Sequence, residues 1–215
     1  MLKITIIIDS DSWINKYIKK LKQNLRKKGH SVRIINQIKR LKKGDISFLI
    51  GCSQIMTKQF LSLNKVNLVI HESDLPKGKG WSPLTWQILK GKNSIPISLL
   101  EVESKVDSGQ IFLRDIMHFK GNELVDELRS KQVKYSFNMF KKFIDRYPSI
   151  IKLGEKQSGK SSFYRRRDAT SSELDINKTF KENFNLLRTT DNDIYPAFFH
   201  YKGEKYIIKI FKDKK

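Results

Sequence analysis

The chain has 215 residues, of which 39% are hydrophobic and 30% charged, and its formal net charge at pH 7 is +21. This length suits one compact domain with a small appendage, and the apolar residues suffice for a packed core. No apolar run reaches the roughly 18 residues that a bilayer span needs, so we expect no membrane span. The single cysteine, Cys52, excludes an internal disulfide framework and favours a cytoplasmic location.

The positive charge does not by itself indicate a nucleic-acid partner. Of the 43 basic residues, 33 are lysine and 10 are arginine, and the lysines are spread along the chain. Phosphate and base recognition favours the arginine fork, so we do not expect nucleic-acid binding. The same positive field would steer an anionic small substrate, such as a nucleotide diphosphate.

Strands and helices alternate through the first part of the chain. Apolar runs predict strands at 3–9, 31–36, 45–50 and 66–70. Ile14, Ile18, Leu21 and Leu25 form the apolar stripe of a helix that Asp11 or Ser12 can cap and Gly29 ends. A short helix is expected near 56–63. This alternation predicts an α/β fold with a doubly wound, mostly parallel, Rossmann-like sheet.

The second part of the chain divides into three stretches. A helix at 83–90, strands at 95–102 and 111–117, and a long helix capped by Asn122 complete a core spanning 1–150. Residues 151–172 are basic and lack apolar periodicity, which is typical of a connecting segment. Residues 173–215 predict a small appendage, a short helix followed by a hairpin with strands at 197–201 and 205–209.

A histidine at a strand end is the most informative feature. His71 directly follows the apolar run 68–70, and Asp107 lies in an Asp-Ser-Gly turn 36 residues later. Polar catalytic groups in open α/β sheets lie just past the carboxyl ends of strands. A histidine supported by a carboxylate is a standard pair for moving protons. Alone, His71 would more often be a structural histidine and Asp107 a turn former.

The residues around this pair resemble the folate-dependent formyltransferases. That family carries an Asn-x-His-x-Ser-x-Leu-Pro run, followed about three dozen residues later by an Asp-x-Gly turn. Matching positions are His71, Ser73, Leu75, Pro76, Asp107 and Gly109. Val69 departs from the pattern, because the family usually has a catalytic asparagine there. Asn67, Asn93 or a loop amide are the groups that could replace it.

The resemblance implies a formyltransferase fold and the residues of its site. His71 and Asp107 would be catalytic. The 10-formyltetrahydrofolate co-substrate would contact Gly51, Gln54, Ile55, Met56, Val106 and Gly109. Candidate substrate contacts are Ser10, Trp13, Ser73, Lys77, Lys79, Trp81 and Tyr164. No metal is implied.

Among such enzymes, the chain is most similar to the sugar N-formyltransferases. The Tyr164–Arg167 run and the later Tyr195-Pro196-Ala197-Phe198 run resemble their segments after the core, although Ile176 stands where an aromatic is usual. The implied reaction formylates the amine of a nucleotide-linked (dTDP or UDP) amino-dideoxy sugar for surface polysaccharides such as O-antigen. A homodimer formed through the carboxy-terminal hairpin is expected.

Three other functions stay open. Residues 154–161 match the phosphate-loop pattern G-x-x-x-x-G-K-S, which would indicate a nucleotide hydrolase if a strand preceded it and a helix followed. Residues 150–153 could form that strand, but 161–170 show no helical stripe, so a flexible loop is favoured. A basic nucleic-acid-binding module and a catalytically degenerate formyltransferase, given Val69, are the remaining alternatives.

Overall fold

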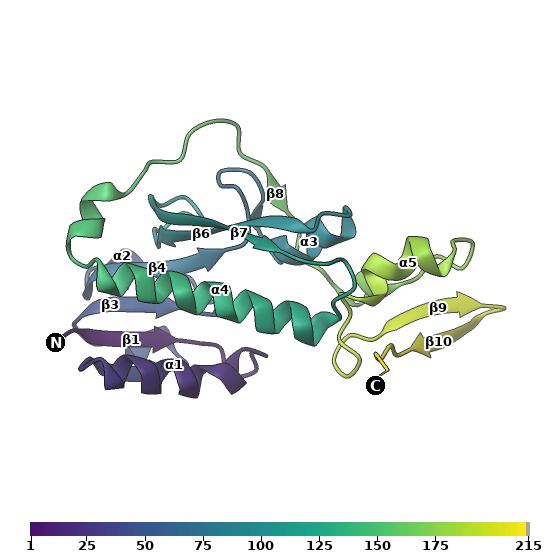
Figure 1. Ribbon diagram of the computed structural model, residues 1–215, viewed down its shortest axis with the longest axis horizontal. Coiled ribbons are helices and arrows are strands. Elements are labelled where there is room, and N and C mark those ends of the chain that lie inside the picture. The colour runs from purple at the N-terminus through teal and green to yellow at the C-terminus, as the bar shows by residue number, and fades with distance from the viewer. Residues whose placement is uncertain (214–215) are drawn as a thin grey trace.

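A six-stranded sheet forms the centre of the computed structural model, which describes residues 1–213. The strand order is β2-β1-β3-β4-β6-β7, and β1 to β4 run parallel while β6 is antiparallel to both neighbours. These strands are β1 (Lys3–Ile7), β2 (Ser31–Ile35), β3 (Gly44–Leu49), β4 (Asn64–His71), β6 (Ser94–Glu101) and β7 (Ile111–His118). The carboxyl ends of the parallel strands point toward the side where the carboxy-terminal part of the chain lies (Figure 1).

Helices cover both faces of the sheet because its central strands are apolar on both. On one face α1 (Asn15–Lys27), α3 (Pro83–Leu89) and α4 (Val125–Asp145) enclose the main core. The rings of Phe48 on β3 and Phe140 on α4 lie 4.1 Å apart there. On the other face, the 3-10 turn η1 (Ile38–Arg40) and the short α2 (Lys58–Leu61) cover a smaller cluster. The expected mostly parallel, Rossmann-like sheet is confirmed.

The segment after α4 returns over the outer side of β6 and β7. It begins with the 3-10 turn η2 (Ser149–Leu153) and arcs across the sheet edge before it descends toward α5 (Figure 1). On the way β8 (Phe163–Tyr164) pairs with β5 (Lys79–Gly80), the loop strand that follows His71. The 3-10 turn η3 (Ala169–Ser172) comes next. The loop after His71 is therefore fixed from outside by residues that come about 85 positions later in the chain.

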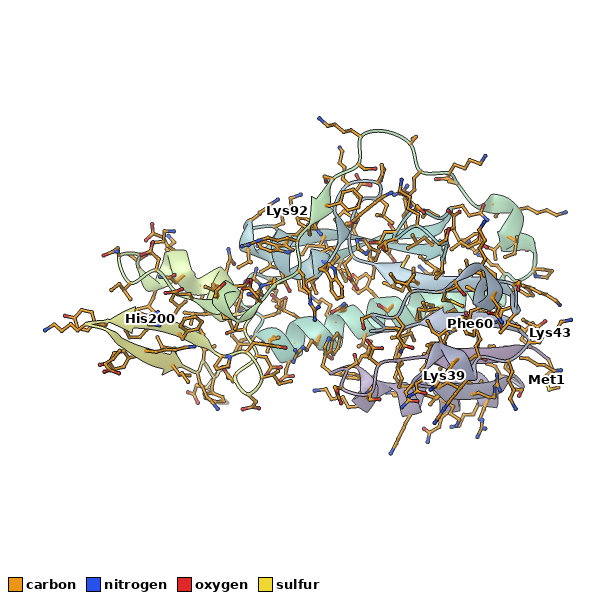
Figure 2. All side chains as sticks on the ribbon, turned by 180° about the vertical axis from the view of Figure 1, so that it is seen from behind. Met1, Lys39, Lys43, Phe60, Lys92 and His200 are labelled. Carbon is orange, nitrogen blue, oxygen red and sulfur yellow. The ribbon has the colours of Figure 1, made fainter. Side chains whose placement is uncertain are left out.

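The last part of the described chain packs around its own apolar cluster. It comprises α5 (Phe180–Leu187) and a hairpin of β9 (Ala197–Tyr201) and β10 (Glu204–Ile208). Leu174, Leu187 and Ala197 are buried together in this cluster. Figure 2 shows that His200 on the hairpin and Met1 lie at opposite ends of the molecule.

A buried arginine joins this carboxy-terminal part to the sheet. Arg188, which follows α5, is 1% exposed. Its Nη2 donates to Asn93 Oδ1 at 3.1 Å, and its Nε donates to Asn185 Oδ1 at 2.9 Å. Its Nη1 lies 3.8 Å from Glu123 Oε2, just ahead of α4. One guanidinium thus contacts the start of β6, the approach to α4 and the end of α5.

Two local expectations were wrong, and one open possibility is answered. Residues 150–153, which could have formed a strand, form part of η2, and no α-helix follows at 161–170, as the missing helical stripe predicted. Helix α4 begins after Leu124, whose N–H donates to Glu127 Oε2 at 2.8 Å, so Asn122 is not its cap. Helix α1 begins at Asn15 without a side-chain cap from Asp11 or Ser12.

Within residues 1–213, no helix has the length and apolar character needed to cross a bilayer.

Replacing the joining arginine should loosen the carboxy-terminal part. Arg188→Ala should lower the free energy of unfolding by about 2–3 kcal/mol, because it removes the hydrogen bonds that this buried charged group donates to Asn93 and Asn185. Urea unfolding checks this. Lys181→Ala, an exposed position on α5, is the matched control and should change little. A loss below about 1 kcal/mol for Arg188→Ala would show that the guanidinium does not hold the two parts together.

Candidate functional site

His71 is the last residue of β4, between the parallel neighbour β3 and the antiparallel neighbour β6. Its side chain is 7% exposed. Nε2 lies 2.7 Å from the carbonyl oxygen of Gly78. Because a carbonyl oxygen only accepts, Nε2 must donate in this contact. Nδ1 is therefore the ring nitrogen that can exchange a proton.

Asp107 faces that second nitrogen. Its Oδ2 lies 3.6 Å from His71 Nδ1 and accepts a hydrogen bond from the Gly80 N–H at 2.8 Å. Its side chain is 11% exposed. The expected pair is thus brought together, and the same carboxylate oxygen also holds the loop that follows β4.

Close packing fixes the turn that carries Asp107. Asp107 has a φ of +49°, in the left-handed region that aspartate tolerates better than most residues. A Cβ atom at Gly109 would lie 2.0 Å from the carbonyl oxygen of Glu101, so no larger residue fits there. Gln157 Nε2 donates to the carbonyl oxygens of both Asp107 and Gly109 at 2.9 Å. Gly109 and Gln157 therefore position the carboxylate.

The expected folate residues divide into exposed and buried groups. Ile55 is 68% exposed and Val106 is 49% exposed, so both present apolar surface to solvent. Gly51 has a φ of +53° and lies against Ser12, where a Cβ atom would approach Oγ to 2.4 Å. Met56 is 1% exposed and packs in the core behind the turn.

Gln54 stabilises the turn after β3 through hydrogen bonds of its side-chain amide. Its Nε2 donates to Asp9 Oδ1 and to the Asn36 carbonyl oxygen, both at 3.0 Å, and its Oε1 accepts from the Ile38 N–H at 3.0 Å. Burial opposes ionisation of Asp9, but hydrogen bonds from Gln54 and Ser53 outweigh it and lower the Asp9 pKa. The Gln54 amide thus ties together the loops after β1, β2 and β3.

A cavity of about 350 Å³ lies beside the end of β4. Its walls come from the residues just ahead of α1, from α3 and α4, from the connecting segment and from the loop after α5. Two indole rings, three guanidinium groups and three carboxyl groups line it: Trp13, Trp81, Arg129, Arg166, Arg167, Glu72, Asp168 and Asp191. His71 and Asp107 do not line it, so the cavity meets the end of β4 through Glu72.

Two of the seven expected substrate residues line this cavity. Trp13 lies beneath Arg129, 5.2 Å from its guanidinium carbon, and Trp81 lies 4.9 Å from that of Arg166. The other five lie outside it. Ser10 and Lys77 are exposed, Lys79 is buried in β5, Ser73 is buried behind His71, and Tyr164 packs on Trp86. Burial raises the Tyr164 pKa, and the ring lies against Gly78.

Sequence reasoning missed four residues of the site. Glu72 and Gln132 meet in the cavity, where Gln132 Nε2 donates to Glu72 Oε1 at 2.6 Å. Arg129 pairs with Asp191 at 2.6 Å. Gln157 holds the Asp107 turn. A glutamate next to the expected histidine was the one signal available, since an acidic residue at a buried strand end needs a reason.

The two asparagines considered as substitutes for the catalytic asparagine that Val69 replaces form hydrogen bonds with other groups. Asn67 donates to the Leu61 carbonyl oxygen and accepts from Ser47 Oγ, and Asn93 accepts from Arg188. The Ser73 hydroxyl, in contrast, is buried and has no hydrogen-bond partner within residues 1–213. It is two residues beyond His71.

The 154–161 stretch lacks the surroundings of a phosphate loop. The 3-10 turn η2 precedes it, and the two-residue strand β8 follows it. The Glu155 backbone pairs with Ile111 at the edge of β7, and Lys160 is exposed. In the part of the chain that the structure describes, no cluster of three or more His, Cys, Asp or Glu side chains could hold a metal ion.

Substitution in the Asp107 turn should be costly. Gly109→Ala should lower the free energy of unfolding by about 3 kcal/mol, the upper end of the usual cost of overpacking, because the new methyl group overlaps the Glu101 carbonyl. Thermal and urea unfolding check this. Ser108→Ala in the same turn removes only surface hydrogen bonds and should cost under about 1 kcal/mol. Equal losses in the two variants would contradict close packing at Gly109.

Comparisons with known proteins agree with this arrangement. The sequence pattern of the formyl transferase family matches residues 14–142, which is more than half of the chain. A methionyl-tRNA formyltransferase from Clostridium beijerinckii is 27% identical over 185 residues, covering 84% of this chain and 59% of the relative. The chain thus spans about three fifths of that protein's length.

Solved structures show the same fold. A methionyl-tRNA formyltransferase from Clostridium thermocellum superposes with a TM-score of 0.83 at 24% identity, covering 100% of this chain and 94% of that one. A 4-N formyltransferase from Francisella tularensis gives 0.77 at 18% identity, covering 100% and 99%. HypX from Aquifex aeolicus in complex with tetrahydrofolic acid gives 0.73 at 14% identity, covering 97% and 37%. With the matching region running from α1 almost to the end of α4, the chain belongs to the formyl transferase family.

Proposed function

We propose that this protein is a folate-dependent N-formyltransferase that acts on the amine of a nucleotide-linked amino sugar. The observation that carries the proposal is the His71–Asp107 pair at the end of β4, next to a cavity lined by tryptophan and arginine. Family membership supports formyl transfer, whereas the sugar substrate rests on the cavity.

The residues at the strand ends fit 10-formyltetrahydrofolate. Ile55 and Val106 expose apolar side chains on the two turns expected to hold it, and Ser73 Oγ is a buried polar atom without a partner. A flat pteridine ring needs apolar contact on its faces and hydrogen bonds at its edges, so this combination suits it. When bound, the folate would supply an activated one-carbon group. Gly51 and Gly109 keep the two turns narrow, and Gln54 and Met56 support them from behind.

The cavity suits a substrate with separated charges. Glu72 lies deep, while Trp81 and Arg166 are exposed at the surface. An acidic floor favours an amino group, and arginine side chains favour phosphate. Indole rings stack on a base or a sugar face. A dTDP- or UDP-linked amino-dideoxy sugar has these features in one molecule, and such sugars are built into surface polysaccharides such as O-antigen and lipopolysaccharide.

His71 would move the proton that formyl transfer requires. Gly78 fixes its Nε2, so Nδ1, facing Asp107, takes the proton from the attacking nitrogen and passes it on. The Asp107 carboxylate stabilises the charged ring while it holds that proton. Val69 donates no hydrogen bond, and the unpartnered Ser73 hydroxyl is the group we propose in place of the usual asparagine, to stabilise negative charge on the reacting oxygen.

The remaining assignments follow from this proposal. Residues 1–150 would supply the chemistry, while 151–172 and 173–215 would complete the cavity. We propose a cytoplasmic location, where folate and nucleotide sugars are available and the lone Cys52 stays reduced. Lys77 and Ser10, which are exposed, would contact the substrate outside the cavity, whereas the buried Lys79 and Tyr164 would shape the loop after His71.

The activity is tested directly with the purified protein. It is incubated with 10-formyltetrahydrofolate and a panel of dTDP- and UDP-linked amino sugars, and mass spectrometry detects formyl gain. Formylation of at least one amino sugar is the expected result. Formylation of methionyl-tRNA alone would replace the sugar substrate, and no formylation of either would support a degenerate enzyme.

Removing the proton-moving histidine should slow the reaction without unfolding the protein. His71→Asn should reduce kcat at least about 100-fold, the usual contribution of one acid-base group. Circular dichroism checks that the fold is retained. His118→Asn, on the exposed face of β7, is the matched control and should stay near the wild-type rate. Near-normal turnover by His71→Asn would remove His71 from the mechanism.

We also propose a homodimer formed through the hairpin, because β9 and β10 leave apolar side chains in solvent. Tyr201, Tyr206 and Ile207 are 46–60% exposed. Light scattering at micromolar concentration should give a dimeric mass that Ile207→Lys reduces to the monomer. Ile194→Lys, equally exposed outside the hairpin, should leave the dimer intact. A monomeric wild-type protein would show that the hairpin serves its own chain only.

A further inference from the structure

We infer that Glu72 receives the amino group of the substrate at the floor of the cavity and takes its first proton. The inference rests on the proposed function and adds a residue to it. It starts from a carboxyl group that is nine-tenths buried yet lines the cavity beside the site.

The protein holds this carboxyl group in place from two sides. Gln132 Nε2 on α4 donates to Oε1 at 2.6 Å, and Gln87 Nε2 on α3 donates to the Glu72 backbone carbonyl at 2.6 Å. Among the described residues, Gln132 is the one side chain that donates to the carboxyl, and no cation is paired with it. Oε2 accepts no hydrogen bond from a side chain of the described residues, and an ammonium group is a charge-assisted donor that a buried carboxylate binds strongly.

The charged groups around Glu72 leave its carboxylate free to pair with the ammonium group of a substrate. His71 favours the ionised form and Asp107 opposes it. Arg129 is engaged by Asp191 at 2.6 Å, and Arg167 donates to the Ser171 carbonyl oxygen. Arg166 lies over Trp81 at the exposed side, and Asp168 is bound to its own turn. None of these groups neutralises Glu72 in the way an arriving ammonium would.

Burial raises the pKa of Glu72, so the free carboxyl holds a proton over a wider pH range than an exposed glutamate does. An ammonium group beside it reverses this effect, because the opposite charge stabilises the carboxylate. A base with a raised pKa also accepts a proton from an ammonium more readily than an ordinary glutamate would. The arrangement therefore suits both binding and deprotonation.

The proton balance of the reaction requires two acceptors. An alkylammonium that becomes a formamide loses two protons. Glu72 takes the first when an N–H bond breaks, and the nitrogen keeps the electron pair with which it attacks the formyl carbon. His71 takes the second and delivers it to the donor nitrogen, whose bond to the formyl carbon breaks. Glu72 then releases its proton to solvent, so the reaction yields formamide, tetrahydrofolate and one proton.

Binding without folate tests the amine contact. Calorimetry compares a dTDP-amino sugar with the dTDP sugar that carries hydroxyl in place of amine. Wild type should prefer the amine at least about 10-fold, and Glu72→Gln should lose this preference without weaker binding of the hydroxyl sugar. Glu204→Gln, exposed on β10, is the matched control. Equal wild-type affinity for the two sugars would overturn the role of Glu72 and leave the proposed function standing.

A second probe separates the two proposals. If neither nucleotide binds, the proposed substrate class fails, and benzylamine against benzyl alcohol then tests Glu72 alone. Benzylamine should raise the melting temperature of wild type but not of Glu72→Gln, since it fits an aromatic cavity with an acidic floor. No difference between amine and alcohol would overturn the inference here as well.

Stability against pH gives a readout that needs no ligand. With its pKa raised in the folded state, ionisation of Glu72 costs the wild type stability as pH rises from the ordinary value of 4.5 through the folded pKa. Glu72→Gln, which mimics the protonated form, avoids this loss. The two melting temperatures should coincide at low pH, and the variant should melt higher once the pH has risen through the folded pKa of Glu72. A variant that melts lower at every pH would show that Glu72 serves the fold instead of the substrate.

Discussion

One carboxylate oxygen holds the candidate site together. Asp107 Oδ2 contacts the ring of His71 at the end of β4 and accepts the backbone N–H of Gly80 in the following loop. That loop pairs with β8 and donates a backbone N–H to Ser162 Oγ. The carbonyl oxygen of Asp107 accepts a hydrogen bond from the Gln157 amide. Three stretches that are distant in sequence therefore meet at Asp107. Loss of this contact would release the histidine, the loop and the connecting segment together.

Much of the fold was predictable because its strands and helices follow strong apolar patterns. The run of isoleucines in β1 and the stripe from Ile14 to Leu25 allow one structural interpretation each. The His71–Asp107 pair was predictable because His71 lies at a strand end, Asp107 lies in a turn between two strands, and their spacing matches a known pattern. Element ends were less predictable. Glu127, three residues into α4, determines where the helix begins, and no single-residue preference for Asn122 could reveal that.

The cavity could not be predicted from the sequence. Its walls combine α3, α4 and two segments after residue 165, which no local pattern brings together. Glu72 and Gln132 are 60 residues apart, and although Glu72 follows a buried strand end, nothing in the sequence indicates Gln132 as its partner. Tertiary packing alone makes them partners. The same holds for Gln54, whose amide joins three loops and so has no free group for the ligand that its position suggested.

The division of the cavity wall affects how new specificities can arise in this fold. The end of β4 carries His71, which we propose to move protons, whereas Arg166, Arg167 and Tyr195 come from chain that lies after the sheet is complete. Changes in that later chain can therefore alter the accepted molecule while the buried strands keep their sequence. Diversification of substrate choice is thus separated from the constraints on folding. A library randomised only in residues 166–172 and 189–195 would explore new acceptors at little risk to the core.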